Sequence, residues 1–464
     1  MALLVAAIGA CLIKYIDVTR DVPQLYLWEQ SIVEDGRRDG ESAIHRSNKL
    51  DYGKGLRVGL DIRYDSYKMR HGNLRDIYDI LIKQSSKAEK SITINGEQLA
   101  ISELNFKVDQ ISKFLSEHKT SCIRVKLDQL FNSVNNFALI VAGFVNQIPV
   151  QLYQHRDLVP SDEATYYEDI DFTKFTSGSL LSFENGYSPD KDKGIALTIF
   201  SKLNHQVESK VEFTQLNLVS AVASTLRHLP LSQHLSDHDT VLISRPDGLL
   251  SNEEALNIII KTLASFISNS TLIIVDGFDQ SMLEKYKPTV LSINQRLLPK
   301  LDSSTKLGLV QNLTKTVNLL SLSFGKFPVF NCSRNELRLV CVNKNITEVA
   351  ISVTELRATL KSRVVVESGY YGIAGPILLT DFYDYRKISV PYKSYGCISQ
   401  SLELKLANYN QNHGYLMARG YNIGKSTNTM NGNVGDSTSK NSDGFMPLLN
   451  VNGSWGKDGC LYVQ

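Results

Sequence analysis

Hydroxyl and ammonium groups gather in one short segment of the chain, residues 200–218, which reads FSKLNHQVESKVEFTQLNL. Ser201 with Lys202, and Ser209 with Lys210, are residue types that contact phosphate oxygens, and the lysines neutralise their charge. A phosphate loop also needs glycine, because a residue without a side chain lets backbone N–H groups approach the oxygens closely. This segment contains no glycine. The segment therefore has side chains that suit phosphate but lacks the glycines of a phosphate loop.

Two other groups of residues resemble sites, and neither has the pattern that its chemistry needs. His228, His234 and His238 lie near one another along the chain, but no cysteine or carboxylate accompanies them in a known metal-ligand spacing. Residues 176–179 read TSGS, like the start of a phosphate loop, but no Gly-x-Pro-Lys-Gly follows. We therefore predict no metal ligands and assign no catalytic residue.

Residues 200–218 also resemble, without a gap, the YTSGTTGxPKGVxLTHxNL phosphate loop of the adenylate-forming (AMP-binding) superfamily. Leu203 and Gln206 stand at its glycine positions, and its Thr-Ser pair becomes Ser-Lys. Ser209 stands at the family's lysine, with Lys210 one residue later. The resemblance implies a former site for the phosphates of ATP that has lost its glycines and its lysine.

Other landmarks of the family's acyl-CoA synthetases follow in the family's order along the chain. They are 91–104 (ITxxGxxxTYxEL), 137–150 (a helix-to-strand step ending in IPV), 287–290 (KPTVL), 367–376 (GYGxTExxP), 414–420 (GEIxxRG), and 443–445 with 457–463 (the two ends of DGWxxTGDxGxxDxDGYLYV). Each motif alone is weak, but their order makes the joint resemblance specific.

The departures from these motifs fall on the residues that do chemistry in the family. Tyr371 and Gly372 keep the GYGxTE pattern, whereas Ala374 stands at its Thr and Gly375 at its Glu. In the family that Glu holds the magnesium bound to ATP, and a carboxylate is suited to it because Mg²⁺ prefers hard oxygen ligands. The resemblance thus implies a lost magnesium site.

The ribose position is degenerate as well. The family's Asp that binds the ribose hydroxyls aligns with Asn450 or Val451, and either choice loses the charged acceptor. Loss of one preorganised group costs about 10²–10³ in rate, so the combined losses imply a chain without adenylation activity and without a cofactor. The alternative left open is a divergent fatty acid–CoA ligase that uses ATP, Mg²⁺ and CoA through an unorthodox phosphate site.

The resemblance covers residues 40–464 and implies an α/β fold, that of the family's large domain. This domain has two mixed β-sheets sandwiched by helices, plus a small β-barrel-like subdomain. Family members continue past the last motif into a smaller C-terminal domain, whereas this chain stops at Gln464. We therefore expect the small domain to be absent.

Periodicity in the chain agrees with an α/β fold, because helical spacing alternates with β-branched runs. Helices are predicted at 77–85, 101–116 and 216–226, and strands at 241–244, 271–275 and 337–342. Two polar stretches, 161–193 and 422–443, are predicted as internal surface loops.

Composition indicates an ordinary folded protein, with 464 residues, 42% hydrophobic and 21% charged. The formal net charge is +2, and no basic stripe with interleaved aromatic residues is found. Nucleic acid is therefore excluded as an expected partner.

The first residues, 1–19, are predicted as an apolar anchor or a first helix. Residues 2–13 are uncharged and mostly apolar, which is too short to span a bilayer. A secretory signal would carry basic residues before its apolar run, and no basic residue precedes this one. We favour a monotopic anchor with Lys14 and Arg20 at headgroup level, and a buried helix or a cleaved signal stay open. Residues 15–21 and 41–44 are similar to the region that follows the N-terminal anchor in fatty-acid-transport-type and very-long-chain acyl-CoA synthetases.

Together these patterns predict a non-catalytic, acyl-CoA-synthetase-like protein that acts as a lipid-associated scaffold or as a lipid- or acyl-binding protein. Its expected location is the cytoplasmic face of the endoplasmic reticulum or a lipid droplet, with the cytoplasm as the alternative. An active acyl-CoA synthetase or another protein is the expected partner besides the lipid surface.

Overall fold

The computed structural model describes residues 14, 18–34, 36–50, 55–63, 68–160, 164–186, 192–203, 207–303, 308–330, 335–349, 352–387, 392–430, 433–436 and 443–464. Its helices are α2 (Leu74–Ser85), α3 (Ile101–Glu117), α4 (Val134–Asn146), α5 (Gln215–His228), α6 (Asn252–Ser268), α7 (Ser281–Tyr286), α8 (Leu298–Ser303), α9 (Leu309–Ser323) and α10 (Thr354–Leu360). Of the predicted anchor 1–19, only Lys14, Val18 and Thr19 are among the described residues. None of the described helices has the length and apolar content needed to cross a bilayer.

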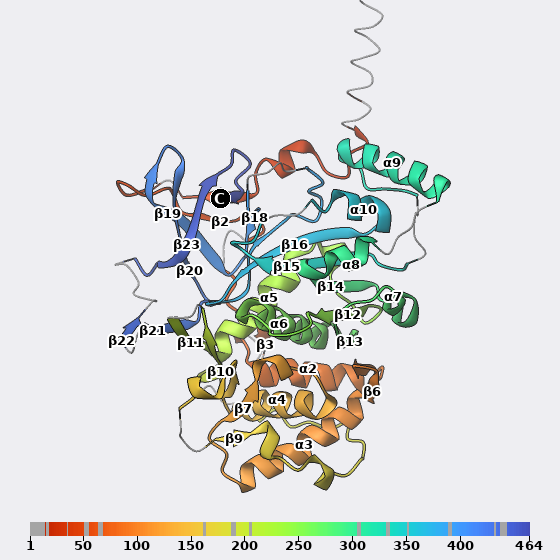
Figure 1. The fold of residues 1–464 in the computed structure, drawn as a ribbon, viewed down its shortest axis with the longest axis vertical. Helices are drawn as coiled ribbons and strands as arrows, with labels where there is room; N and C mark the ends of the chain where they lie inside the picture. The colour runs from red at the N-terminus through yellow and green to blue at the C-terminus, as the bar shows by residue number, and fades with distance from the viewer. Residues whose placement is uncertain are drawn as a thin grey trace, which may run out of the picture.

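The described strands form two large sheets and one small one (Figure 1). The first sheet runs, in spatial order, β1 (Ser31–Val33), β2 (His45–Ser47), β19 (Leu402–Asn410), β20 (His413–Gly420), β23 (Met446–Trp455), β24 (Leu461–Val463), β18 (Ser394–Ile398), β17 (Ile373–Leu379), β16 (Arg363–Tyr370), β15 (Leu339–Asn345), β14 (Val290–Asn294), β12 (Thr240–Arg245), β13 (Thr271–Asp276), β5 (Ser91–Ile94) and β6 (Glu97–Ala100). The second runs β22 (Asn433–Asp436), β21 (Lys425–Met430), β11 (Val207–Thr214), β10 (Ile195–Lys202), β8 (Val150–Tyr153), β7 (Ile123–Lys126) and β9 (Thr165–Tyr166). The small sheet pairs β3 (Ile62–Arg63) with β4 (Met69–Arg70).

The centre of the first sheet is parallel and lies between two layers of helices. Strands β5, β13, β12, β14, β15 and β16 are mutually parallel. Their inner residues are buried on both faces, which explains why they read as continuous apolar runs. Helix α6 covers one face and contacts α2 and α5, while α7, α8 and α10 pack on the other face. Helix α5 contacts β17 of the first sheet and β10 and β11 of the second, so it joins the two sheets.

The antiparallel end of the first sheet has a hydrophobic cluster of its own. Residues of β19, β20, β23 and β24 form it, with Leu404, Leu416 and Leu461 fully buried. This end is the small subdomain that the sequence predicts, and the α/β fold with two sandwiched sheets is confirmed.

All six predicted elements are present as α2, α3, α5, β12, β13 and β15, with shifts of a few residues at their ends. The loop prediction for 422–443 is wrong in part, because β21 and β22 lie there and extend the second sheet from β11. Backbone hydrogen bonds make this pairing, so an edge hairpin forms without the apolar side chains that would reveal it. In 161–193 the described residues form little regular structure beyond β9 and short 3₁₀ turns.

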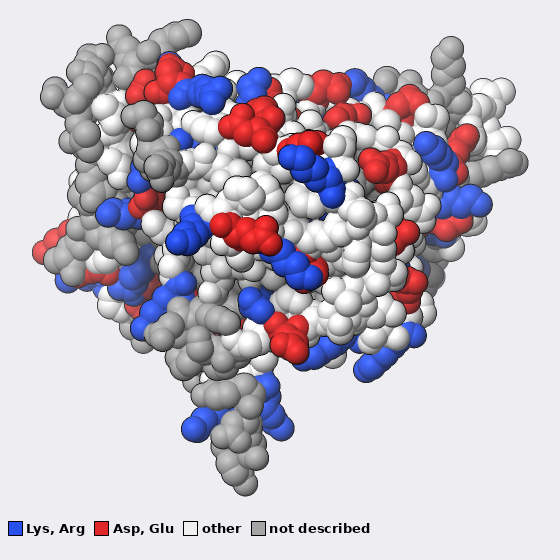
Figure 2. All heavy atoms as spheres, turned by 90° about the horizontal axis from the view of Figure 1, so that it is seen from below, with Lys and Arg blue, Asp and Glu red and all other residues white. Residues whose placement is uncertain are grey.

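The face of the molecule seen from below in Figure 1 mixes both signs of charge. Lysine and arginine side chains lie beside aspartate and glutamate side chains there, around a large uncharged area (Figure 2). The described part of this face therefore carries no single-sign field.

Candidate functional site

Strands β10 and β11 carry the four predicted phosphate-loop residues as an antiparallel hairpin. Ser201 pairs directly with Ser209, and Phe200 pairs with Lys210. The backbone N–H of Leu203 donates to the carbonyl of Val207 at 2.9 Å and closes the hairpin. That N–H, at a glycine position of the motif, is therefore already used within the hairpin. His205 and Gln206 lie outside the described residues.

The lysines of the hairpin point away from the position of the motif's lysine. Successive side chains of a strand face opposite sides of the sheet, so Lys210 lies on the side opposite to Ser209. Ser209 is buried, while the Lys210 ammonium is partly exposed and pairs with Glu212 at 2.6 Å. Lys202 is also partly exposed and pairs with Asp157 at 3.3 Å. Lys210, one residue after the position of the motif's lysine, therefore does not place an ammonium group where the motif has one.

The two serines are what remains at the former phosphate position. Ser201 and Ser209 are 2% and 3% exposed, and neither hydroxyl has a hydrogen-bond partner among the described residues. Unpaired buried hydroxyls each cost about 1–3 kcal/mol unless water reaches them. Two neutral hydroxyls can hold a water molecule, but they do not balance the charge of a triphosphate.

The turn after β16 and the first residues of β17 carry the predicted magnesium position, with Gly375 inside β17. Gly375 has a φ of 73°, a region that other residues rarely adopt. A Cβ atom built there would lie 3.3 Å from the Cβ of Ala221 and 3.8 Å from the hydroxyl of Thr225, both on α5. Ala374 beside it is fully buried. A side chain at this position would therefore start in a tight contact with α5.

Backbone pairing connects this turn to the serine hairpin. The N–H of Ala374 donates to the carbonyl of Asn422 at 2.9 Å, and the N–H of Gly424 donates to the carbonyl of Gly372 at 3.0 Å. The chain then continues into β21, which pairs with β11 from Val207 to Glu212. The structure thus brings the predicted phosphate and magnesium positions onto neighbouring, hydrogen-bonded segments.

A tyrosine that the sequence comparison did not single out closes the space near the ribose position. Tyr370 precedes Tyr371, and their ring centroids lie 4.5 Å apart. The Tyr370 hydroxyl accepts a hydrogen bond from the N–H of Leu449 at 3.0 Å, next to Asn450. Burial is the main cause that raises the pKa of Tyr370. The signal available in the sequence was an aromatic residue at the first glycine of the GYG motif.

Of the two residues aligned with the ribose-binding Asp, Val451 is fully buried in β23 and Asn450 is exposed with a φ of 61°. Asn450 is therefore the positional equivalent. Its amide is uncharged, so the position keeps a hydrogen-bonding group without the carboxylate.

Comparisons with known proteins agree with this geometry. No protein-family model matches the chain. An uncharacterized protein of Saccharomyces cerevisiae is 25% identical over 543 aligned positions, which cover 97% of this chain and 94% of that protein. Among solved structures, the luciferase-like enzyme of the mealworm Zophobas morio aligns with a TM-score of 0.57 at 13% identity, covering 88% of this chain and 98% of the enzyme.

Two ligases give the same result. The O-succinylbenzoate coenzyme A synthetase of Bacillus subtilis aligns with a TM-score of 0.57 at 14% identity over 83% of this chain and 97% of that chain. A long-chain-fatty-acid–CoA ligase of Archaeoglobus fulgidus aligns with a TM-score of 0.57 at 14% identity over 88% and 86%. The chain has the adenylate-forming fold. Because the sequence identities are only 13–14%, this likeness shows the fold alone.

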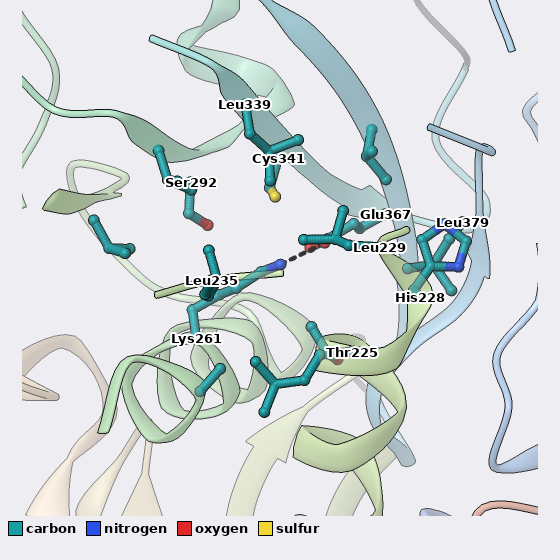
Figure 3. Close-up of a pocket in the computed structure, with 15 residues that line it drawn as sticks. Thr225, His228, Leu229, Leu235, Lys261, Ser292, Leu339, Cys341, Glu367 and Leu379 are labelled. Carbon is teal, nitrogen blue, oxygen red and sulfur yellow. Dashed lines mark hydrogen bonds and ion pairs between the residues drawn. The ribbon is translucent and has the colours of Figure 1, made fainter. Parts of the chain in front are cut away.

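Within this adenylate-forming fold, a cavity lies between α5, α6 and strands β12 and β14–β17 (Figure 3). The Lys261 ammonium reaches into it and pairs with Glu367 at 2.5 Å, and Asn257 donates to the same carboxylate at 3.0 Å. Burial alone would lower the pKa of Lys261, but the neighbouring Cys341 and Glu367 outweigh it and raise the pKa. Burial raises the pKa of the Cys341 thiol to about 12, which favours its protonated form.

The cavity is small. Its free volume is about 20 Å³, which is room for one water molecule. Apolar side chains form most of its walls, including Leu229, Leu235 and Leu339. The arrangement is a buried, neutralised ion pair in a nearly filled core, and an acyl chain does not fit into it.

The remaining sequence candidates lie in unrelated surroundings. His228 is buried and its Nε2 contacts a backbone carbonyl, His234 is half-buried, and the side chain of His238 is 92% exposed. Among the described residues, no three His, Cys, Asp or Glu residues gather as a metal site would require. In the TSGS segment, Gly178 lies against the ring of Phe106, where a Cβ atom would come within 2.6 Å. That glycine is explained by packing.

Proposed function

We propose that this chain is a non-catalytic protein built on the adenylate-forming fold, and that it acts as a scaffold at a membrane or lipid-droplet surface. The observation that carries the non-catalytic part of the proposal is at Gly375, which aligns with the family's magnesium-binding Glu. Its φ is 73°, and an added Cβ atom would lie 3.3 Å from the Cβ of Ala221 in α5, so the position disfavours a carboxylate side chain.

Three further features support the absence of adenylation, one at the phosphate position and two at the ribose position. At the phosphates, Ser209 offers a neutral hydroxyl on the buried side of β11 while Lys210 faces the other way. At the ribose, Asn450 has no charge. Near it, the Tyr370 hydroxyl holds the backbone of Leu449. Because catalysis of phosphoryl and acyl-phosphate chemistry depends on preorganised charge, such a site offers little stabilisation to the transition state.

The buried cavity around Lys261 has a free volume of about 20 Å³ and holds about one water molecule, so we expect no acyl chain there. Larger hollows open at the surface, including one of about 490 Å³ that Leu27, Trp28 and Leu319 help to line. In this proposal the lipid contacts the surface of the protein. The apolar run at residues 2–13 supports a lipid surface as the location, and so do Leu25 and Trp28, which are 60% and 55% exposed.

Nucleotide binding tests the non-catalytic part of the proposal. We expect isothermal titration calorimetry of the full chain to show no heat with ATP, with or without Mg²⁺ and a long-chain fatty acid. The thermal midpoint should also stay constant in millimolar MgATP, since a ligand that binds the folded state raises stability in proportion to the logarithm of its concentration over Kd. Magnesium-dependent binding in the micromolar range would overturn the proposal in favour of a divergent acyl-CoA ligase.

A further inference from the structure

Helix α9 presents an apolar stripe to solvent. Leu309, Leu313, Val317 and Leu320 follow one another at spacings of four, four and three residues, and Val310 lies beside them. They are 86%, 69%, 46%, 56% and 77% exposed, respectively. Side chains at these spacings share one face of a helix, and such a stripe normally faces the core. In α9 it faces outward.

The opposite face of α9 fixes this orientation. Asn318 and Leu322 are buried, and the Asn318 amide donates to the carbonyls of Ala358 in α10 at 2.9 Å and of Phe330 at 3.0 Å. Leu322 packs against Ala358 and Tyr385. Because these contacts hold the inner face, α9 cannot turn its stripe inward without breaking them.

The stripe continues past the end of the helix. Phe324, Val329 and Phe330 are 42%, 62% and 57% exposed. We call the exposed residues of this region the α9 surface, namely Leu309, Val310, Leu313, Val317, Leu320, Phe324, Val329 and Phe330. Helix α9 lies at one end of the long axis of the molecule, at the top in Figure 1.

Helix α9 itself carries almost no charge. Lys315 is the single charged residue of α9, and its ammonium pairs with Glu355 at 2.9 Å. The residues that flank the stripe are threonine, asparagine, glutamine and serine. Attraction to an anionic partner needs unpaired cations, so this surface depends on apolar burial for its binding.

The N-terminal apolar run joins the fold beside the end of α9. The N–H of Asp21 donates to the carbonyl of Gly325 at 3.2 Å, and its carboxylate accepts from Arg363 at 2.9 Å and from the Tyr385 hydroxyl at 2.7 Å. The run at 2–13 therefore ends only a few residues before a point fixed to α9. Residues of the segment 20–28, which follows this run, line one open groove together with Leu319 and Leu322 of α9.

We propose that the α9 surface docks onto a phospholipid surface with loosely packed headgroups, and that it does so together with the N-terminal run. A lipid surface fits better than a second copy of the chain for two reasons. The apolar sequence 2–13 ends eight residues before Asp21, which is hydrogen-bonded to Gly325 just after α9, and an exposed aromatic side chain suited to the headgroup region, Trp28, lines the same groove as α9. An uncharged polar rim with bulky apolar residues binds by insertion between headgroups, without a need for anionic lipids.

This inference rests on the proposed lipid-surface role, and vesicle flotation of the full chain tests both. The wild type should float with dioleoyl phosphatidylcholine vesicles, and added phosphatidylserine or salt should change its partition little. The variant Leu313→Glu/Val317→Glu/Leu320→Glu should partition roughly a hundredfold less, because three partly inserted apolar side chains are replaced by charges. Leu231→Glu/Leu249→Glu places charges at two exposed leucines away from the α9 surface and serves as the matched control.

The outcomes separate the two ideas. Wild type that fails to float with any vesicle contradicts the lipid-surface role itself. Wild type and the α9 variant that float equally leave that role to the N-terminal run and overturn the α9 proposal. A wild-type dimer that the α9 substitutions convert to a monomer by light scattering, with no change in flotation, also overturns it and makes the α9 surface a self-association interface. Circular dichroism and the thermal midpoint confirm that each variant is folded.

Discussion

Gly375 is where a single residue decides what the former nucleotide site can hold. Its φ of 73° favours glycine, and the methyl group of Ala221 stands at the distance of a tight contact from any added Cβ atom. The loss of the carboxylate is therefore built into the packing of α5 on β17. Ser209 shows a comparable loss, since it places a neutral, buried hydroxyl at the position that aligns with the family's lysine.

Substitution of this glycine tests the contact. We expect Gly375→Ala to lower the free energy of unfolding by about 1–3 kcal/mol, because the new side chain is strained at positive φ and crowds Ala221. Gly372→Ala is the matched control in the same turn. A Cβ atom there meets only the Tyr370 ring, at an ordinary 3.8 Å, so its effect should stay within about 0.5 kcal/mol. Urea unfolding measures both, and equal effects would contradict the role of the contact.

At the scale of elements, the sequence predicts what local pattern determines. Strands β12 and β13 are recognisable because a parallel central strand is apolar on both faces, and α3 because its apolar residues repeat with the helical period. Strand β21 is not recognisable, since its Ser426, Thr427 and Asn428 pair through the backbone at a sheet edge. The outward stripe of α9 was missed as well, because spacing defines a face but not the direction in which it points.

The candidate site also has features that local sequence predicts and features that depend on packing. Motif spacing placed Ser201 and Ser209 at one former site, and the structure pairs them directly. The contact of Ala221 with Gly375 and the hydrogen bond from Leu449 to Tyr370 join residues far apart in the sequence. One sequence does not determine such contacts, because they depend on how helices and strands pack.

The junction between β2 and β23 gives the molecule a pH-dependent stability. His45 in β2 stacks on Trp455 in β23 with ring centroids 3.5 Å apart, and its Nδ1 contacts the Ser31 hydroxyl at 3.0 Å. Burial lowers the pKa of His45 from 6.5 to about 4. Between these two values the unfolded chain binds a proton that the folded chain refuses, so stability falls as pH falls through this window.

A substitution isolates this effect. His45→Phe keeps an aromatic ring against Trp455 and has nothing to titrate. Between pH 6.5 and pH 4, its stability should therefore decline less than that of the wild type, by up to about 3 kcal/mol. Urea unfolding at a series of pH values gives the difference between the two proteins. Parallel pH profiles would show that another group causes the acid sensitivity.

At the scale of the whole molecule, the N-terminal segment ties distant parts together. The sequence resemblance begins at residue 40, but residues before it already take part in the fold. The N–H of Gln30 donates to the carbonyl of Asp458 at 2.9 Å, and β1 pairs with β2, which pairs with β19. The same segment also contacts the residues just after α9, because the N–H of Asp21 donates to the carbonyl of Gly325.

Two truncations test this tie. Removal of residues 2–17 ends before the hydrogen bonds of Asp21, so it should leave the thermal midpoint unchanged. Removal of residues 2–34 deletes β1 and the bonds of Asp21 and Gln30, and it should lower the midpoint by several degrees. Differential scanning calorimetry measures both chains. If the longer truncation melts at the wild-type temperature, the segment only lies on the surface and does not stabilise the fold.

The close approach of Ala221 to position 375 also determines what a substitution toward the family's motifs would cost. A carboxylate at 375 needs more room beside α5 than glycine does. The only smaller residue for position 221 is glycine, which weakens the interior of a helix by about 1 kcal/mol. A lysine at 209 would place a charge in a buried position. Under the proposed function, each such substitution therefore lowers stability before it contributes to adenylation.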